Sequence, residues 1–212
     1  VHKVMQQLRR KEIEGLSSLS ISSFDTMELS YYPNTMDHQL GETIREYMHQ
    51  TLLDLRDYAT AFSPSERENL LFIGNAGLGK THAALSIAGE VLAQGYDVIY
   101  ISSANFFSKL DDSHFNSSST ESEILLETVS NADLLILDDL GTEFNTPYFI
   151  TAFYTLLNNR LGSKLPTIIT TNITDGSLME KLYTEKISSR LASFAQIKFL
   201  GNDVRIKKAN EQ

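Results

Sequence analysis

Gly74-Asn75-Ala76-Gly77-Leu78-Gly79-Lys80-Thr81 is the stretch that decides the fold. It follows the pattern G-x-x-x-x-G-K-T, in which glycines let the backbone curl so that its N–H groups face a polyphosphate. The preceding run 70–73 is short and apolar, as expected of a buried strand. Residues 82–94 then have apolar side chains at helical spacing, and Gly95 can end that helix. Strand, glycine loop and helix N-terminus together predict a phosphate-binding site.

The loop also predicts how a nucleotide and its metal would be bound. Lys80 is expected to reach the β- and γ-phosphates of ATP, and the Thr81 hydroxyl to ligate Mg²⁺. The backbone of the whole loop and of the residue after it would surround the phosphates. The expected nucleotide-binding residues are therefore Gly74, Asn75, Ala76, Gly77, Leu78, Gly79, Lys80, Thr81 and His82.

Two further apolar runs end in polar side chains suited to the same chemistry. Residues 134–137 run into Asp138 and Asp139, and residues 167–171 run into Asn172. The ends of parallel strands are where ligands sit in sheets of this kind. We expect Asp138 to hold Mg²⁺ through water and Asp139 to orient or deprotonate the attacking water. Asn172 is expected to place its amide near the γ-phosphate.

Composition limits the classes of function. The chain has 212 residues, which suits one domain with a short appendage, and no apolar run is long enough to cross a membrane. It contains no cysteine, so a cytoplasmic location is the default expectation. The net charge of −9 argues against a nucleic-acid-coating protein. Any DNA contact must therefore be a local groove, or must be built from several copies. The chain opens at Val1 rather than Met, as expected of a fragment of something longer.

Strands and helices alternate along the chain, which predicts a parallel sheet with helices on both faces. Residues 1–14 read as a basic amphipathic helix, 15–23 as a linker, and 114–122 as a polar loop with little intrinsic order. The expected helices are 38–62, 82–94, 104–110, 124–129, 146–161 and 178–191, and the expected strands are 70–73, 97–102, 134–137, 167–172 and 196–200.

The order of these parts separates the classes of phosphate-loop protein. A full strand-plus-helix unit lies between the glycine loop and the acidic strand, as in ATPases of the additional-strand type. The Asn-Lys-x-Asp tetrad of GTPases does not occur in the sequence. The arginine-rich lid of small-molecule kinases is not evident either.

The sequence contains four motifs that belong together: Gly74 to Thr81, Leu134 to Glu143, Thr170 to Asn172, and Glu185 to Leu191. In combination they resemble the bacterial replicative helicase loaders of the DnaC/DnaI type. These loaders are AAA+ ATPases, and transposon-associated IstB ATPases are their close relatives. The resemblance covers roughly residues 20–206 and implies a five-stranded parallel sheet with little or no C-terminal helical lid.

The resemblance also implies residue roles and a division of the chain. Asn172 matches the sensor-1 residue, Arg190 the arginine finger, and Arg205 the sensor-2 residue that joins the nucleotide-binding set. With Lys80 and Asp139, the residues Asn172 and Arg190 would be catalytic. We expect an N-terminal helix and linker at 1–23, the ATPase domain at 24–206 and a tail at 207–212. Residues 104–122 match an extra helix that loaders place near single-stranded DNA.

Several points depart from the family pattern or stay open. Most AAA+ proteins have glutamate where Asp139 stands, and the nearby Glu143 leaves the identity of the base open. We expect no counterpart here of the loaders' N-terminal partner-binding domain, unless the first residues are its remnant. Phe106, Phe107 and Lys109 are either a stacking platform for single strands or, for the phenylalanines, part of the core.

The sequence thus predicts a slow ATPase, stimulated by assembly, that loads a replicative ring helicase onto single-stranded DNA. Its expected partners are that helicase, single-stranded DNA bound weakly and locally, and other copies of itself. One alternative is an IstB-like transposition ATPase acting on duplex DNA. Another is an adaptor that senses ATP without hydrolysing it.

Overall fold

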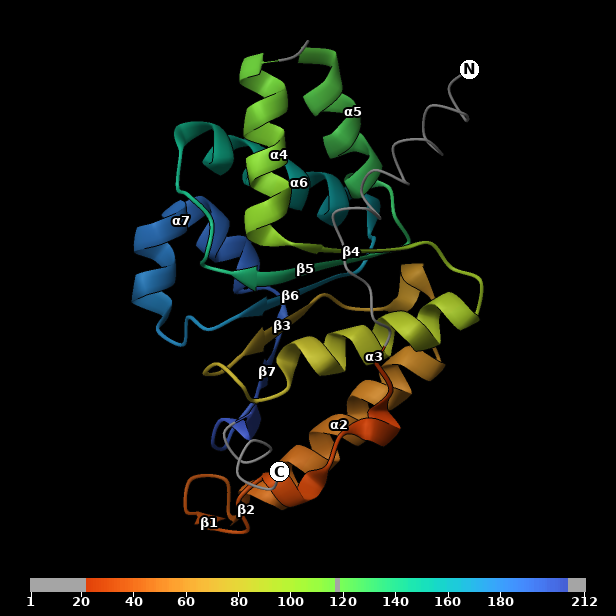
Figure 1. Ribbon diagram of the computed structural model, residues 1–212, viewed down its shortest axis with the longest axis vertical. Helices are drawn as coiled ribbons and strands as arrows, with labels where there is room; N and C mark the ends of the chain where they lie inside the picture. The colour runs from red at the N-terminus through yellow and green to blue at the C-terminus, as the bar shows by residue number, and fades with distance from the viewer. Residues whose placement is uncertain (1–21, 117–118, 206–212) are drawn as a thin grey trace.

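The computed structural model describes residues 22–116 and 119–205 (Figure 1). A five-stranded sheet, in the order β4-β5-β6-β3-β7, forms the centre of the molecule, and all its neighbouring strands are parallel. A two-stranded antiparallel hairpin, β1-β2, lies apart from it. The strands are β1 Met36–Asp37, β2 Glu42–Thr43, β3 Leu70–Ile73, β4 Val98–Ser102, β5 Leu134–Leu140, β6 Thr167–Thr171 and β7 Ala195–Lys198.

Helices cover both faces of the sheet, as predicted (Figure 1). Helices α4 to α7 pack on one face, and α3 with α2 outside it covers the other. The helices are α2 Ile44–Thr60, α3 Lys80–Ala93, α4 Ser103–Asn116, α5 Ser119–Ser130, α6 Pro147–Ser163 and α7 Gly176–Leu191, with short 3₁₀ helices η1 Phe24–Thr26, η2 Leu29–Tyr31 and η3 Pro64–Glu66. Within the described ranges, no helix is long and apolar enough to span a bilayer.

The strand order places three functional strand ends side by side. Strand β6 lies between β5 and β3, so the ends that carry Asp138, Asn172 and the glycine loop meet at one edge of the sheet. Strand β5 is buried on both faces because helices lie above and below it, which explains its continuous apolar run. It extends beyond the predicted end, through Asp138 and Asp139, to Leu140.

Two predicted boundaries are wrong. The helix expected from residue 38 begins only at Ile44, because Glu42 and Thr43 pair with the strand Met36–Asp37. Thr43 then caps α2 by a reciprocal capping box with Glu46. The polar loop expected at 114–122 is largely helical, since α4 runs to Asn116 and α5 starts at Ser119. Burial of Leu125 and Val129 against the neighbouring helices explains why packing overrides the weak propensity of the serines.

Other signals are confirmed by the backbone. Thr146 accepts a hydrogen bond from the N–H of Phe149 at 3.0 Å and Pro147 opens α6, as the predicted N-cap requires. Gly95, at φ 90°, follows the end of α3. The expected N-terminal helix at 1–14 and the C-terminal tail at 207–212 lie outside the described residues.

Candidate nucleotide-binding site

The glycine loop joins β3 to the N-terminus of α3 (Figure 1). Gly79 is the N-cap of α3 at φ 94°, and no side chain caps the first N–H groups of this helix. Those groups are thus free to bind an anion. Gly77 stands at φ 76°, where an added Cβ would lie 1.9 Å from the carboxylate of Asp203. Only glycine therefore lets the segment at Asp203 close over the loop.

A cavity of about 310 Å³ lies above the loop. It brings together residues from β5, β6 and the segment near Arg205, as well as from the loop itself. Almost all of the residues predicted to bind the nucleotide line this cavity. Its lining is Ala76, Gly77, Leu78, Gly79, Lys80, Thr81, His82, Asp139, Thr170, Asn172, Val204 and Arg205.

Lys80 is buried at the floor of this site, with 6% of its surface exposed. Its ammonium donates hydrogen bonds to the backbone oxygens of Gly74 at 2.5 Å and Asn75 at 2.7 Å, and to Oδ1 of Asn172 at 2.8 Å. Burial lowers the pKa of Lys80 to about 8, although the carboxylates of Asp139 and Asp138 act in the opposite direction. The cation is thus held in place by oxygens that a phosphate would replace.

Thr81 and Asp138 are in direct contact. The Thr81 hydroxyl donates to the two carboxylate oxygens of Asp138, at 3.0 and 3.1 Å. The hydroxyls of Tyr100 and Thr170 also donate to this carboxylate, at 2.7 and 2.6 Å, and fix its orientation. Tyr100 did not stand out in the sequence, and Thr170 stood there only as part of the Thr170 to Asn172 motif, because both contacts come from strands beside β5.

This pair of oxygen donors fits Mg²⁺, which takes one or two protein oxygens together with phosphates and water. No cluster of three or more acidic or histidine side chains that could hold a metal ion by itself occurs in 22–116 and 119–205. A metal at Thr81 and Asp138 would therefore need the phosphates of the nucleotide as further ligands.

Asp139 and Asn172 form the other side of the site. The amide of Asn172 donates to Oδ1 of Asp139 at 3.1 Å, and Thr170 accepts from the Asp139 N–H at 2.9 Å. Asp139 has φ 58°, which turns its side chain into the cavity instead of along the strand. Burial, and then the neighbouring charge of Asp138, raise the pKa of Asp139. A raised pKa suits a carboxylate that accepts a proton from water.

Glu143 is occupied elsewhere and does not line the cavity. Its carboxylate accepts hydrogen bonds from the Ser103 hydroxyl at 2.7 Å, the Gly141 N–H at 3.1 Å and the Tyr183 hydroxyl. These three donors, none of which lines the cavity, hold the carboxylate outside it.

The two predicted arginines differ in position. Arg205 lines the cavity and forms an ion pair with Asp203 at 2.7 Å. Arg190 does not line it. Its guanidinium donates to Oδ1 of Asn158 at 2.6 Å and lies over the ring of Tyr154, 4.3 Å from the centroid.

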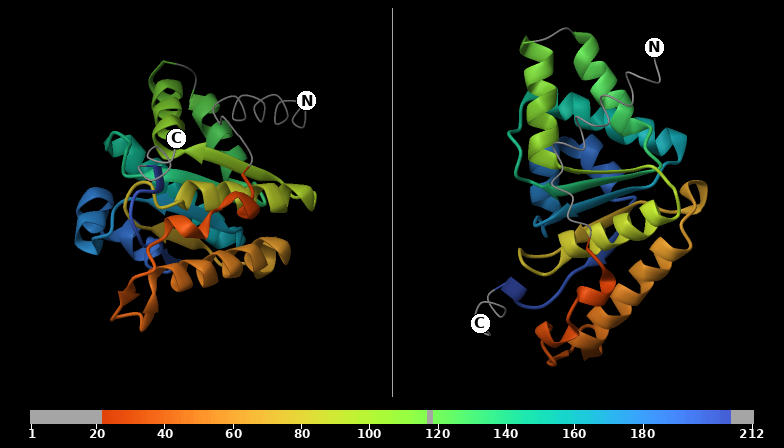
Figure 2. Two further views of the ribbon diagram at one scale, coloured as in Figure 1. Left: turned by 60° about the horizontal axis from the view of Figure 1, so that its bottom comes forward. Right: turned by 45° about the vertical axis from the view of Figure 1, so that its right-hand side comes forward.

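The segment 24–32, which precedes α2, contacts the outer side of the glycine loop. It lies against α2 and α3, as Figure 2 shows. The Tyr32 hydroxyl donates to the Leu78 oxygen at 2.9 Å, and Thr26 contacts the ring of His82 at 2.9 Å. Three buried aromatic residues, Phe24, Tyr31 and Tyr32, lie in this segment.

Of the two interpretations of Phe106 and Phe107, the core placement is confirmed and the stacking platform for single-stranded DNA is wrong. Phe106 and Phe107 are 0% and 2% exposed, and their side chains pack from α4 into the core. Their rings belong to an aromatic cluster that stabilises the α4–α7 layer. The cluster comprises Phe106, Phe107, Phe149, Phe153 and Tyr183.

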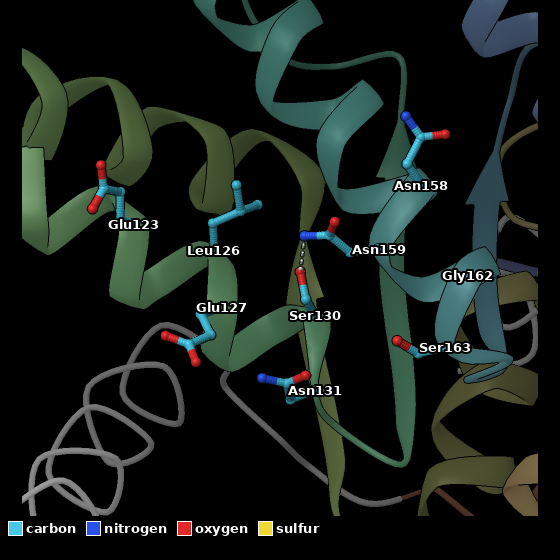
Figure 3. Close-up of a pocket in the computed structure, with 9 residues that line it drawn as sticks. All are labelled: Glu123, Leu126, Glu127, Ser130, Asn131, Asn158, Asn159, Gly162 and Ser163. Carbon is cyan, nitrogen blue, oxygen red and sulfur yellow. Dashed lines mark hydrogen bonds between the residues drawn. The ribbon is translucent and has the colours of Figure 1, made fainter.

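A second and larger cavity, of about 560 Å³, lies between α5 and α6 (Figure 3). Its side chains include Glu123, Glu127 and three asparagines, and Asn159 donates to the Ser130 hydroxyl at 3.4 Å. A lining with two carboxylates and no cation does not suit a polyphosphate. Chemistry rather than size therefore favours the cavity at the glycine loop as the candidate nucleotide site.

The chain is similar to proteins of DNA replication. A replicative helicase loader, DnaC of Escherichia coli strain K12, is 34% identical over 123 residues, which are 58% of this chain and 49% of the relative. This chain thus spans about half the length of the curated relatives it matches.

Solved structures support the fold. A crystal structure of a DnaC helicase loader superposes with a TM-score of 0.68 at 22% identity, over 84% of this chain and 97% of the other. A replication initiator DnaA, bound to AMPPCP and single-stranded DNA, gives a TM-score of 0.63 at 19% identity, over 92% of this chain and 55% of the other. These likenesses confirm the predicted AAA+ phosphate-loop fold.

The model of one protein family, described as IstB-like ATP binding protein, matches residues 35–209. The match includes the glycine loop, the acidic end of β5 and Asn172. It covers most of the chain, so the chain belongs to the IstB-like ATP-binding protein family.

Proposed function

We propose that this chain is an ATPase that loads a replicative ring helicase onto single-stranded DNA. The observation that supports the ATPase is one cavity lined by Lys80, Thr81, Asp139 and Asn172. Asp138 is hydrogen-bonded to Thr81, and Asn172 to Asp139. The similarity to a protein named replicative helicase loader supports the partner.

In this function each side chain has a distinct role. Lys80 would exchange its backbone oxygens for the β- and γ-phosphates. Thr81 would ligate Mg²⁺, which neutralises phosphate charge when bound, and Asp138 would hold that ion through water. Asp139 would accept the proton of the attacking water, while Asn172 orients the reacting groups.

Assembly would complete the site. Arg190 lies away from the cavity of its own chain, so it would act on the nucleotide of a neighbouring copy. We therefore propose an ATP-dependent homo-oligomer with slow turnover in the isolated chain. Single-stranded DNA would be a weak and local contact of this assembly.

The decisive experiment is retention of the replicative helicase by ATP-loaded protein in a lysate of the host. Lys80→Ala protein, treated identically, is the matched control. Helicase retained by the first protein but not by the second supports the proposal. Equal retention by both, or by neither, contradicts an ATP-dependent loader.

A transposition ATPase is the second candidate, because the family is described as IstB-like. Its activity would be stimulated by duplex DNA rather than by the helicase. The net charge of −9 argues against it, since duplex binding needs an extended basic surface. Turnover measured with each partner in turn separates the two functions.

A further inference from the structure

Glu143 joins three elements that are far apart in the sequence. Its donors are Ser103 at the start of α4, Gly141 in the loop after β5, and Tyr183 in α7. Ser103 is fully buried and Tyr183 is 1% exposed, whereas Glu143 is half-buried and Gly141 is exposed. The carboxylate therefore fixes the loop after Asp139 to both helices.

The loop is also tied to the nucleotide cavity. The Thr142 hydroxyl donates to the backbone oxygen of Asp139 at 2.9 Å, while the Asp139 side chain lines the cavity. Gly141 lies close to Tyr183, because a Cβ added to it would be 3.9 Å from the tyrosine oxygen. A shift of Asp139 would thus displace the loop and change its contact with Tyr183.

Next to Tyr183, the backbone of α7 is strained. Thr184 has φ 71° and ψ 155°, a conformation that essentially only glycine adopts freely, and it interrupts the helix. A β-branched residue in this conformation persists only where the surroundings enforce it. Here α7 is divided into a first segment, 176–183, and a second segment, 185–191.

Both segments contact α6, but only the first also binds Glu143 in the loop after β5. The first is held through Tyr183, whose hydroxyl binds Glu143 and whose ring packs 5.8 Å from that of Phe153. The second carries Arg190, which Asn158 and Tyr154 of α6 hold. Thr184 is therefore the point at which a movement of one segment is passed to the other.

We propose that Glu143 is a positioning residue, which transmits nucleotide occupancy through Tyr183 and Thr184 to the segment that carries Arg190. This inference rests on the proposed function, because it requires nucleotide at the glycine loop. It assigns to Glu143 a role different from that of a catalytic base. It also explains why a strained residue stands between the cavity and Arg190.

Hydrogen exchange, with and without Mg²⁺ and AMPPCP, tests the coupling in the whole chain. In the wild-type protein, nucleotide is expected to slow exchange at residues 74–81 and to change it severalfold at residues 185–191. Tyr183→Phe keeps the buried ring and removes only the hydroxyl. It is expected to retain the response at 74–81 and to lose the response at 185–191.

Two further variants separate coupling from stability. Tyr58→Phe is the matched control, because Tyr58 also donates a hydrogen bond from a buried ring, to the Glu68 oxygen at 3.0 Å. It should respond to nucleotide as the wild type does. Thr184→Gly should raise the thermal midpoint, since glycine relieves the strain, and should weaken the response at 185–191.

The outcomes distinguish the proposed coupling from the proposed nucleotide binding on which it rests. Absence of protection at 74–81 in the wild-type protein contradicts nucleotide binding itself. Protection at 74–81 with an unchanged response at 185–191 in Tyr183→Phe overturns the coupling alone. Absence of any response at 185–191 in a wild-type protein that binds nucleotide overturns it as well.

Discussion

The ammonium of Lys80 donates a hydrogen bond to Oδ1 of Asn172 at 2.8 Å, although 92 residues separate them in the chain. The same amide group of Asn172 donates to Asp139 at 3.1 Å. Asn172 thus spans the cation expected to bind phosphate and the carboxylate expected to activate water. A nucleotide bound at Lys80 would therefore lie beside a side chain that also contacts Asp139.

Lys80→Ala should abolish measurable ATP binding while leaving the fold intact. Two charge-assisted hydrogen bonds to phosphate, each worth about 1.5 kcal/mol or more, correspond to a loss of at least about 100-fold in affinity. Titration calorimetry measures the affinity and circular dichroism the fold. Lys181→Ala removes an exposed lysine of α7 and is the control. Unchanged ATP affinity in Lys80→Ala would show that the glycine loop is not the binding site.

Binding should depend on pH through Lys80. Its pKa is lowered to about 8 by burial, so the free site loses its ammonium as the pH rises above that value. Bound phosphate stabilises the ammonium, so the complex holds more protons than the free site. ATP affinity is therefore expected to fall above about pH 8, by up to roughly tenfold per pH unit. Calorimetry at pH 8.5 in buffers of different ionisation heat should show proton uptake, which should vanish at pH 6.5. Equal heats in all buffers at pH 8.5 would be inconsistent with this assignment.

The three carboxylates near the end of β5 should have separable roles. Asp138→Asn is expected to weaken Mg²⁺-dependent ATP binding, because it removes one of the two carboxylate oxygens that accept from Thr81. Asp139→Asn should retain binding and lose roughly 10²–10⁴-fold in turnover, as for loss of a general base. Steady-state phosphate release and nucleotide titration measure both effects. Loss of turnover in Glu143→Gln, with normal hydrolysis by Asp139→Asn, would move the base to Glu143.

Arg190 should act between copies. Isolated chains are expected to bind ATP and hydrolyse it slowly, with turnover rising at high protein concentration or with helicase. Arg190→Ala should keep binding and lose this stimulation, which for arginine fingers amounts to roughly 10³–10⁵ in rate. Mixing Arg190→Ala with Lys80→Ala protein provides the geometric test. The first retains a nucleotide site and the second an arginine, so mixed interfaces should recover activity. A mixture that assembles but stays inactive would rule out action in trans.

The sequence alone was enough to predict those parts of this protein that depend on residues close together in the chain. The glycine loop, the helix after it and the Thr146–Pro147 start of α6 depend on consecutive residues, so their pattern predicted them correctly. The parallel five-stranded sheet also followed, because buried strands carry continuous apolar runs and alternate with helices.

The tertiary structure decided whatever depends on neighbours from other strands and helices. Thr170 and Tyr100 reach Asp138 because β6 and β4 lie on either side of β5, a register that no local pattern encodes. Phe106 and Phe107 are core because α4 packs on β4 and β5 and against α5 and α6, whereas an exposed helix would have presented them to solvent. Glu143 was a candidate base by its sequence distance from Asp139. Ser103 and Tyr183, 40 residues away on either side, instead make it a structural contact, since a carboxylate takes the hydrogen-bond donors that the fold brings to it.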